Sequence, residues 1–299
     1  MTKNDQTVHL PVLLGHVLQY AAPQTGESYL DLTAGYGGHS GAILERTGAA
    51  DKAVLVDRDE NAIAVLDQKF GASGARILHA DFLQASRTLR EEGDKQFDII
   101  LADLGVSSPH LNDAHRGFAI AADGPLDMRM DPRQEVSAAT IVNTYPVDDL
   151  ADILKRYGEE PKARRIAQDI VDYRQAEEIT TTAQLAGIAS KAWPGHSRVH
   201  PATRTFQALR IAVNDELRQV EESLPLWIDL LAPGGRLLVI SFHSLEDRIV
   251  KRAFQTAGGD RYDAQLRILT KRPVVADATE TVSNPRARSA KLRAAAKQK

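Results

Sequence analysis

The first hundred residues alternate between short apolar runs and segments whose apolar positions recur every three or four residues. The spacing predicts helices over residues 40–47, 61–70 and 86–92. The runs predict four strands, over residues 28–33, 52–57, 75–79 and 97–103. Continuous apolar strands separated by helices are typical of a parallel sheet covered on both faces. This part of the chain therefore predicts an α/β fold.

The alternation stops after residue 103. Residues 105–131 are rich in Gly, Pro, Asp and Ser and predict a long loop, whereas residues 138–192 have helical spacing only. The best helical segments are 147–157, 164–175 and 182–192, the last with a threonine cap among residues 180–182. Sheet-like patterning then resumes, with a helix at 203–231 and strands at 236–242, 265–271 and 289–293. The pattern predicts an α/β domain formed by residues 1–110 and 203–299, interrupted by a mostly helical insertion at 111–202.

Composition narrows the classes of function. The chain of 299 residues has no cysteine, which excludes disulfides, thiolate zinc sites and cysteine nucleophiles. Its net charge of −3 means that any nucleic-acid surface must be a local patch. The polar N-terminus lacks a signal-peptide pattern, and no apolar run approaches the roughly 20 residues that span a bilayer. We expect a cytoplasmic protein that does not contact a membrane.

Candidate ligand-binding residues follow the predicted strands. The stretch Asp31–His39 contains three glycines, which let the backbone approach a ligand at the start of the next helix. Asp57 lies 22 residues after Gly35, a spacing suited to a ribose diol. The pair Asp81-Phe82 and the acid Asp103 follow the third and fourth strands. Ligands of open α/β sheets bind at the carboxyl ends of strands, so these residues predict a nucleoside-type cofactor.

Two alternatives remain at this point. A dinucleotide fingerprint would need glycine at position 40, where the chain has Ser40, and this favours S-adenosylmethionine. The plainer alternative is that the glycines form only a tight turn and that Asp57 caps a helix.

Longer strings carry a specific resemblance. They are Asp103–Pro109, Arg116–Phe118, Asp123–Asp131, His200–Arg210, Val213–Leu217, Ser241–Arg248 and Asn284–Ser289. From about residue 9 to residue 293 the chain resembles the bacterial 16S ribosomal RNA cytosine-N4 methyltransferase family, called RsmH and formerly MraW. The strings are long and occur in the order of that family.

The resemblance implies a class I S-adenosylmethionine methyltransferase with a Rossmann-like seven-stranded sheet and an inserted helical domain. It also implies methylation of the N4 amine of a cytidine in the decoding region of 16S ribosomal RNA within the small subunit. The sequence leaves a monomer and a homodimer both open. Carried over residue by residue, it assigns cofactor contacts to Gly37, Gly38, His39, Asp57, Phe82, Asp103 and His110. At position 110 the family commonly has Gln, but His can also donate or accept a hydrogen bond.

The chemistry singles out Asp103 as the catalytic candidate. The lone pair of the N4 amine is delocalised into the cytosine ring, so an enzyme must align the amine and accept its hydrogen bonds. DNA amino-methyltransferases use Asn or Asp followed by Pro-Pro and an aromatic residue at this place. Here Asp103 matches in position, but the residues after it do not. We therefore assign Asp103 first to the cofactor and second to the amine, and expect backbone carbonyls of residues 105–109 to orient the base.

Two basic stretches are candidates for RNA contact. Residues 191–210 contain no acid, and the resemblance favours RNA contacts there over a merely solvated face. The tail from residue 284 is also basic, but only residues 284–289 belong to the family pattern. The candidate RNA-binding residues are Arg198, His200, Arg204, Arg210, Arg286 and Arg288.

Other acid and histidine pairs have plain interpretations. His196 and His200 have a metal-ligand spacing, but nearby prolines disfavour a helix, and we expect no metal. His243 and Glu246 could act as acid and base, cap a helix or contact RNA. Asp127 and Asp131 could bind magnesium, but bracing of their loop is the simpler role.

Two further functions stay open. One is a nicotinamide-dependent oxidoreductase on the same type of sheet. The other is a ribosome assembly factor without catalysis.

Overall fold

The computed structural model describes residues 11–93, 96–105, 113–193, 195, 199–259 and 262–298. The chain divides into two compact units. The first comprises residues 1–105 and 217–299, and the second residues 106–216. None of the helices in the described ranges is long and apolar enough to cross a membrane.

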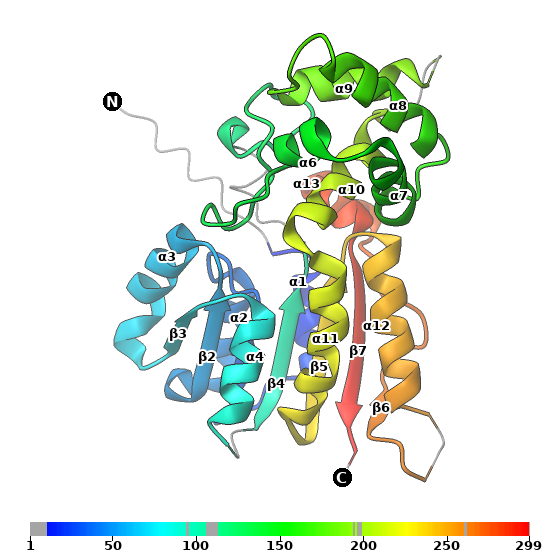
Figure 1. Ribbon diagram of the computed structural model, residues 1–299. Helices are drawn as coiled ribbons and strands as arrows, with labels where there is room; N and C mark the ends of the chain where they lie inside the picture. The colour runs from blue at the N-terminus through cyan, green and yellow to red at the C-terminus, as the bar shows by residue number, and fades with distance from the viewer. Residues whose placement is uncertain are drawn as a thin grey trace. The chain divides into compact units, whose positions relative to one another are not determined.

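The first unit contains a seven-stranded sheet in the order β3-β2-β1-β4-β5-β7-β6 (Figure 1). Strands β1 to β5 are parallel, and β7 is antiparallel to both of its neighbours. The predicted seven-stranded α/β fold is confirmed. The strands are β1 (Tyr29–Asp31), β2 (Ala53–Asp57), β3 (Arg76–His79), β4 (Phe97–Asp103), β5 (Leu231–Ser241), β6 (Leu266–Ile268) and β7 (Lys291–Lys297).

Helices cover both faces of this sheet, as the continuous apolar strands predict. One face packs against α4 (Phe82–Glu91), α11 (Glu216–Asp229) and α12 (Ser244–Ala257), with Trp227 among the fully buried residues. The other face packs against α1 (Leu14–Ala21), α2 (Gly38–Thr47) and α3 (Glu60–Phe70). Short 3-10 turns are η1 (Ala50–Lys52), η2 (Gly71–Ser73) and η4 (Pro285–Ser289).

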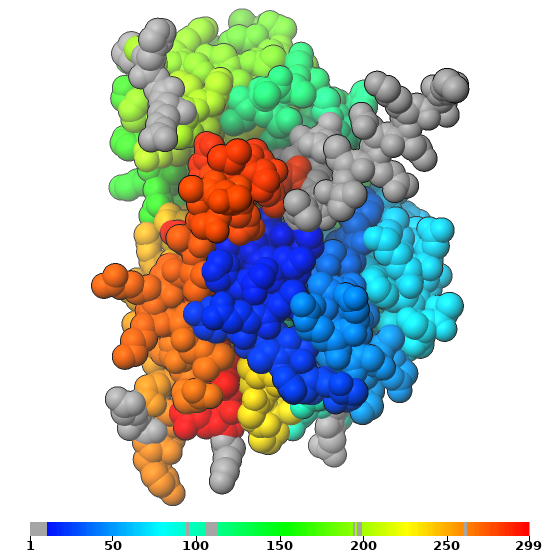
Figure 2. Space-filling view, turned by 180° about the vertical axis from the view of Figure 1, so that it is seen from behind, coloured from blue at the N-terminus to red at the C-terminus, as the bar shows by residue number. Residues whose placement is uncertain are grey.

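Helix α1 also contacts a distant part of the chain. The Leu13 N–H donates to Glu280 Oε1 at 2.6 Å. Glu280 belongs to α13 (Ala278–Ser283), and Figure 2 shows this segment beside α1 on the surface. The sequence pattern does not predict helices α1, α12 and α13.

The second unit is helical. Apolar side chains of its helices form a core of their own, which includes Leu150, Ile166 and Leu185. Thr181 caps α9 by accepting a hydrogen bond from the Gln184 N–H, as the threonine run predicts. The elements are η3 (Ala114–Arg116), α6 (Ala138–Thr144), α7 (Val147–Gly158), α8 (Ala163–Arg174), α9 (Thr182–Lys191) and α10 (Thr203–Asn214).

The predicted helix over residues 203–231 is wrong in one respect, because it is two helices. Helix α10 ends at Asn214, and Asp215 adopts a left-handed conformation with φ of 51° before α11 begins. Both helices have apolar faces, so the periodicity continues across the break. Those faces belong to different cores, with Phe206 and Leu209 of α10 in the helical unit and Leu224 of α11 against the sheet. The insertion therefore ends near residue 216 and not at 202.

The last strands also differ from their predicted bounds. Strand β6 covers only residues 266–268, whereas β7 extends to residue 297. The end of β7 includes Ala294, Ala295 and Ala296, all buried. Alanine has little preference for strands, so local pattern does not mark this segment, and pairing with β5 and β6 decides it.

Asn214 fastens the loop before α6 to the end of α10 within the second unit. Its amide donates to the carbonyls of Met128 and Arg210, both at 2.8 Å, and accepts from the Met130 N–H at 2.8 Å. Met128 has a strained φ of 62°, so this stretch of loop needs such support. Asn214 is fully buried, and the loop and the asparagine both lie in strings that carry the family resemblance.

We predict that Asn214→Ala lowers the free energy of unfolding of the helical unit by about 2–4 kcal/mol, because it leaves buried backbone groups of the loop without partners. Hydrogen exchange of the Met128 and Met130 amides measures the local effect, and thermal unfolding measures the global one. Asn143→Ala is a control in the same unit, since Asn143 is only partly buried and bonds residues of other segments. Unchanged exchange at Met130 in Asn214→Ala would contradict this role.

Candidate active site

The glycine loop joins β1 to α2 at the carboxyl edge of the sheet. Gly37 has φ of 78°, and a Cβ atom there would lie 2.5 Å from the Phe70 ring. At Gly38 a Cβ atom would lie 2.7 Å from Pro11 Cγ. Both positions therefore require glycine. Within the described ranges no side chain caps α2, which leaves the N-terminus of this helix available to a polar ligand group.

A buried carboxylate fixes the shape of this loop. Asp31 is 1% exposed, and its Oδ2 accepts hydrogen bonds from the hydroxyls of Tyr29 and Ser40, both at 2.6 Å. Its Oδ1 accepts from the Thr33 N–H at 3.2 Å. Burial raises the pKa of Asp31, and the two hydroxyls act in the opposite direction. Ser40, which occupies the position of the third glycine of a dinucleotide fingerprint, thus has a structural role of its own.

Asp57 holds the loop from the neighbouring strand. One carboxylate oxygen accepts from the Gly35 N–H at 2.8 Å, and the other accepts from the Asp59 N–H at 2.9 Å. Burial raises its pKa despite these hydrogen bonds. The alternative that Asp57 is only a helix cap is wrong, because Asp59 caps α3 by accepting from the Asn61 N–H. The sequence does not single out Asp59, since Asp57 and Asp59 are both acids before the same helix.

His39 and Asp103 come together at the ends of α2 and β4. His39 Nε2 lies 3.6 Å from Asp103 Oδ2. Among the described residues neither ring nitrogen of His39 has a hydrogen-bond partner, and neither does Asp103 Oδ1, although all three atoms are buried. The Asp103 N–H donates to Thr33 Oγ1 at 2.6 Å, which ties the acid to the glycine loop. Buried polar atoms normally have partners, so this group of atoms is suited to a polar ligand.

Phe82 lies at the start of α4, directly after the cap residue Asp81. The Phe82 ring is only 7% exposed and packs edge-on against Trp227, with 5.7 Å between ring centroids. Contact between this ring and an adenine stays a prediction.

Some predicted positions lie outside the described residues. These are His110, Arg198 and His196, together with residues 106–109 of the loop expected to orient the base. Gly105, at the start of that loop, has φ of 101°, and a Cβ atom there would lie 3.3 Å from the Phe242 ring.

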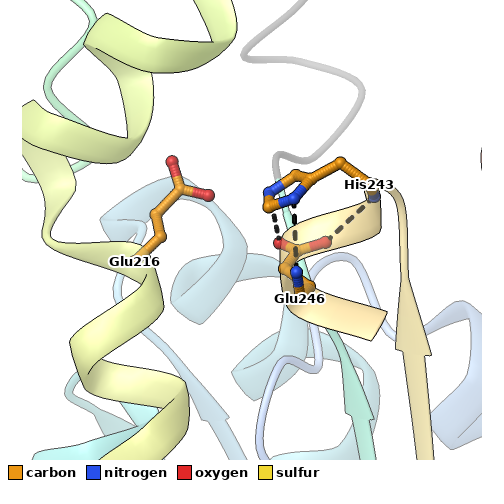
Figure 3. A group of neighbouring side chains, drawn as sticks. All are labelled: Glu216, His243 and Glu246. Carbon is orange, nitrogen blue, oxygen red and sulfur yellow. Dashed lines mark hydrogen bonds and ion pairs between the residues drawn. The ribbon is translucent and has the colours of Figure 1, made fainter. Parts of the chain in front are cut away.

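His243 and Glu246 form a reciprocal cap at the start of α12 (Figure 3). The Glu246 N–H donates to His243 Nδ1 at 3.3 Å, and Glu246 Oε2 accepts the backbone N–H groups of Phe242 and His243 at 2.8 and 3.3 Å. His243 Nε2 also lies 3.2 Å from Glu246 Oε1. These contacts account for the pair as a helix cap, with β5 running directly into it.

The basic stretch of the helical unit has mixed exposure. Arg204 is exposed. His200 is also exposed, and its Nδ1 accepts from the Ala202 N–H at 3.2 Å. Arg210 instead makes a two-pronged ion pair with Glu216, with both N–O distances 2.8 Å, so its charge is locally balanced. Phe206 is buried in the core and cannot stack on a base.

Trp193 is occupied in another way. The Lys162 ammonium lies 4.3 Å from the centroid of its ring, on the same unit. A base could therefore stack only on the opposite face of the indole.

The two candidates near the C-terminus both lie on η4. Arg288 is exposed, whereas Arg286 is partly buried, and burial lowers its pKa. In the loop before α6, Asp127 binds the Arg129 guanidinium at 2.8 and 2.7 Å, and Asp131 binds Arg133 at 2.8 to 3.1 Å. These arginine pairs brace the loop and occupy the carboxylates.

We predict that Ser40→Ala lowers the free energy of unfolding by about 2 kcal/mol at neutral pH, because a buried carboxylate loses a hydroxyl donor. The pKa of Asp31, already raised by burial, should rise further. A raised carboxyl pKa costs stability when the group ionises, so the effect should be full above the folded-state pKa and smaller below it. Urea unfolding from pH 8 to the lowest pH that keeps both proteins folded measures this trend.

Ser73→Ala is the matched control for this variant, since the exposed Ser73 hydroxyl bonds only to the Phe70 carbonyl. A loss of stability in Ser40→Ala that does not change with pH would contradict the proposed bond to an ionised Asp31.

Comparison with known proteins identifies relatives over nearly the whole chain. A ribosomal RNA small subunit methyltransferase H from Nitratidesulfovibrio vulgaris (strain DP4) is 48% identical and covers 99% of this chain and 98% of its own length. A protein of the same name from Trichlorobacter lovleyi is 47% identical, covering 97% and 98%. Among solved structures, a methyltransferase from Streptococcus mutans in complex with SAH covers 97% of this chain and 99% of its own, with 10% identity and a TM-score of 0.44.

The model of one protein family matches residues 6–298. It is described as the MraW methylase family, the family that the sequence strings around Asp103, His200 and Phe242 resemble. Family and full-length relatives agree on an S-adenosylmethionine-dependent methyltransferase. The chain belongs to the MraW methylase family.

Proposed function

We propose that the protein transfers a methyl group from S-adenosylmethionine to the N4 amine of a cytidine in the decoding region of 16S ribosomal RNA. The observation that carries the proposal is the group of buried, unpartnered polar atoms on His39 and Asp103, where the glycine loop meets the end of β4. The names of the full-length relatives support small-subunit ribosomal RNA as the substrate. Since bacterial small subunits are cytoplasmic, the proposal implies a cytoplasmic enzyme.

The residues present fit the cofactor. We assign its ribose hydroxyls to Asp57, since each carboxylate oxygen already accepts one backbone N–H and keeps a second lone pair. The open N-terminus of α2, with Gly37, Gly38 and His39, would bind the polar groups beyond the ribose, and Phe82 would border the adenine. When bound, the cofactor supplies an electrophilic methyl group on a positively charged sulfur.

Asp103 is the residue that we assign to the substrate amine. Its Oδ1 has no partner among the described residues, and its backbone is held by Thr33. An acceptor fixed in this way can take a hydrogen bond from the amine and favour the orientation in which the nitrogen lone pair meets the methyl group. As the new N–C bond forms, the amine loses one proton, which the Asp103 carboxylate would accept. His39 Nε2, 3.6 Å from Asp103 Oδ2, is placed to stabilise that carboxylate.

The two other functions lack comparable support. A nicotinamide-dependent oxidoreductase would use a third glycine at position 40, where Ser40 instead binds Asp31. A non-catalytic assembly factor would not need buried polar atoms without partners at the end of β4. Family membership also favours a methyltransferase.

We predict that Asp103→Ala reduces kcat by at least about 100-fold and weakens S-adenosylmethionine binding. Both effects are expected because the Asp103 carboxylate is assigned to the substrate amine and also to the cofactor. Calorimetric binding and single-turnover methyl transfer separate the two effects. Asp277→Asn is the control, since Asp277 caps α13 in the same unit and asparagine keeps that cap. Normal cofactor binding together with full turnover in Asp103→Ala would remove both assigned roles.

The product decides the proposed reaction. Tritium from labelled S-adenosylmethionine should enter small subunits from a strain that lacks this protein, and nucleoside analysis should give N4-methylcytidine. We predict that free cytidine is a very poor substrate, because the enzyme must bind a base extruded from structured RNA. Label at carbon 5 or at a ribose oxygen would overturn the assigned reaction. Equal methylation of free cytidine and subunits would contradict recognition of structured RNA.

A further inference from the structure

The edge of the sheet formed by β7 and β6 carries a cavity in the first unit. A cavity of about 650 Å³ opens between α12 and the outer strands β6 and β7. We call it the cationic groove. Among the described residues that line it, none is acidic and four are basic: Lys251, Arg267, Lys271 and Arg293.

Three of these four cations are available to a ligand. Lys251, Arg267 and Lys271 are exposed, and within the described ranges none of them forms an ion pair or a side-chain hydrogen bond. Arg293 differs, because it is 6% exposed and its guanidinium binds Asp247 at 2.6 and 3.1 Å. The charge of the buried Arg293 is therefore neutralised by Asp247, whereas the three exposed cations of the groove remain unpaired within the described ranges.

The remaining lining combines buried groups with two exposed glutamines, Gln255 and Gln298. Phe254 is buried in the core against the sheet. The buried hydroxyl of Thr270 already accepts from the Ala294 N–H at 2.9 Å and lies 3.5 Å from the Ala294 carbonyl. The charge of the lining thus comes from its cations, and contacts between cations and phosphates position a polyanion without reading its sequence.

The groove contrasts with the charge of the whole chain, which is −3. A protein with a net negative charge repels a polyanion, so RNA can approach only where cations are gathered without acids. Elsewhere many basic residues are paired with acids, for example Arg76 with Glu92, Arg87 with Glu222 and Arg236 with Glu27. The groove differs from these ion pairs, because three of its cations have no acidic partner among the described residues.

We propose that the cationic groove binds backbone phosphates of the ribosomal RNA substrate, away from the nucleotide that is methylated. This inference rests on the proposed function, which makes structured RNA the substrate. The groove belongs to the unit that carries the candidate active site, so bound phosphates would fix the orientation of this unit on the RNA. The part played by the groove is electrostatic, and each phosphate that it binds releases counterions.

The test removes the three free charges in the variant Lys251→Gln/Arg267→Gln/Lys271→Gln. The control Arg46→Gln/Lys52→Gln/Arg90→Gln removes three positive charges from α2, η1 and α4, none of which lines the groove. Binding to protein-free 16S RNA and to unmethylated small subunits is measured between 50 and 300 mM salt, with methyl transfer and S-adenosylmethionine binding in parallel. The salt concentration thus varies about sixfold, which is enough to define the slope of log affinity against log salt.

We expect the groove variant to lower the slope of log affinity against log salt by about 3 for both RNA and subunits, since each lost phosphate contact lowers it by about 1. KM for subunits should rise at least about tenfold, with kcat and cofactor affinity within about twofold of the wild type. The control variant should keep the wild-type slope.

Two results would overturn the proposal. One is a slope of log affinity against log salt that the groove variant and the control change equally. The other is weaker binding to subunits with unchanged binding to protein-free RNA, which would assign the groove to an acidic ribosomal protein. A wild-type protein that binds RNA with this salt dependence but transfers no methyl group would overturn only the proposed function.

Discussion

The candidate site depends on one buried carboxylate. Asp31 ends β1 inside the sheet and accepts hydrogen bonds from Tyr29, Ser40 and the Thr33 N–H. Ser40 lies in the first turn of α2, so this carboxylate connects the strand to the helix across the glycine loop. Thr33 in turn accepts the Asp103 N–H, which extends the same network to β4. A buried charge is stable only when hydrogen-bond donors surround it. Here the donors belong to β1, the glycine loop and α2, which must all be positioned for a cofactor to bind.

The glycine loop is held from a second side by Asp57 through the Gly35 N–H. With both sides fixed, the close approach of Gly37 to Phe70 and of Gly38 to Pro11 leaves no room for side chains. His39 follows directly and remains without partners among the described residues, as does one oxygen of Asp103. Rigid support around a few unpartnered polar atoms is the arrangement that a preorganised methyl-transfer site requires. Asp31 and Ser40 therefore support the loop, whereas the roles that we propose in methyl transfer fall on His39 and Asp103.

The basic residues of the basic sequence stretches and of the groove differ in whether an acid engages them. Arg210 and Arg293 lie in basic sequence stretches, but each is engaged by an acid, Glu216 and Asp247 respectively. Arg204 and the three other cations of the groove, Lys251, Arg267 and Lys271, are exposed. Because an ion pair within the protein competes with a phosphate for the same guanidinium, sequence clusters of arginine overstate the surface that RNA can use. The exposed, unpaired cations are the better guide.

Most of the sheet could be predicted from the sequence, because a strand buried on both faces must be apolar throughout. Strands β1 to β4 match the predicted runs closely, and so do helices α7 to α9, whose apolar stripes face one core. The family strings around Asp103 and Phe242 likewise identify the chemistry from sequence alone, since they are long and non-degenerate.

Only the tertiary structure decided the rest. The boundary at Asp215 is invisible to periodicity, because α10 and α11 both carry apolar faces and differ only in the core that each face joins. The alanine-rich β7 forms because two partner strands supply its hydrogen bonds. Asn214 gains its role from residues more than 80 positions away in the chain, and Ser40 gains its role from the strand before its helix. Local pattern specifies which residues are buried, and it is the contacts between distant segments that determine which polar groups remain free to act.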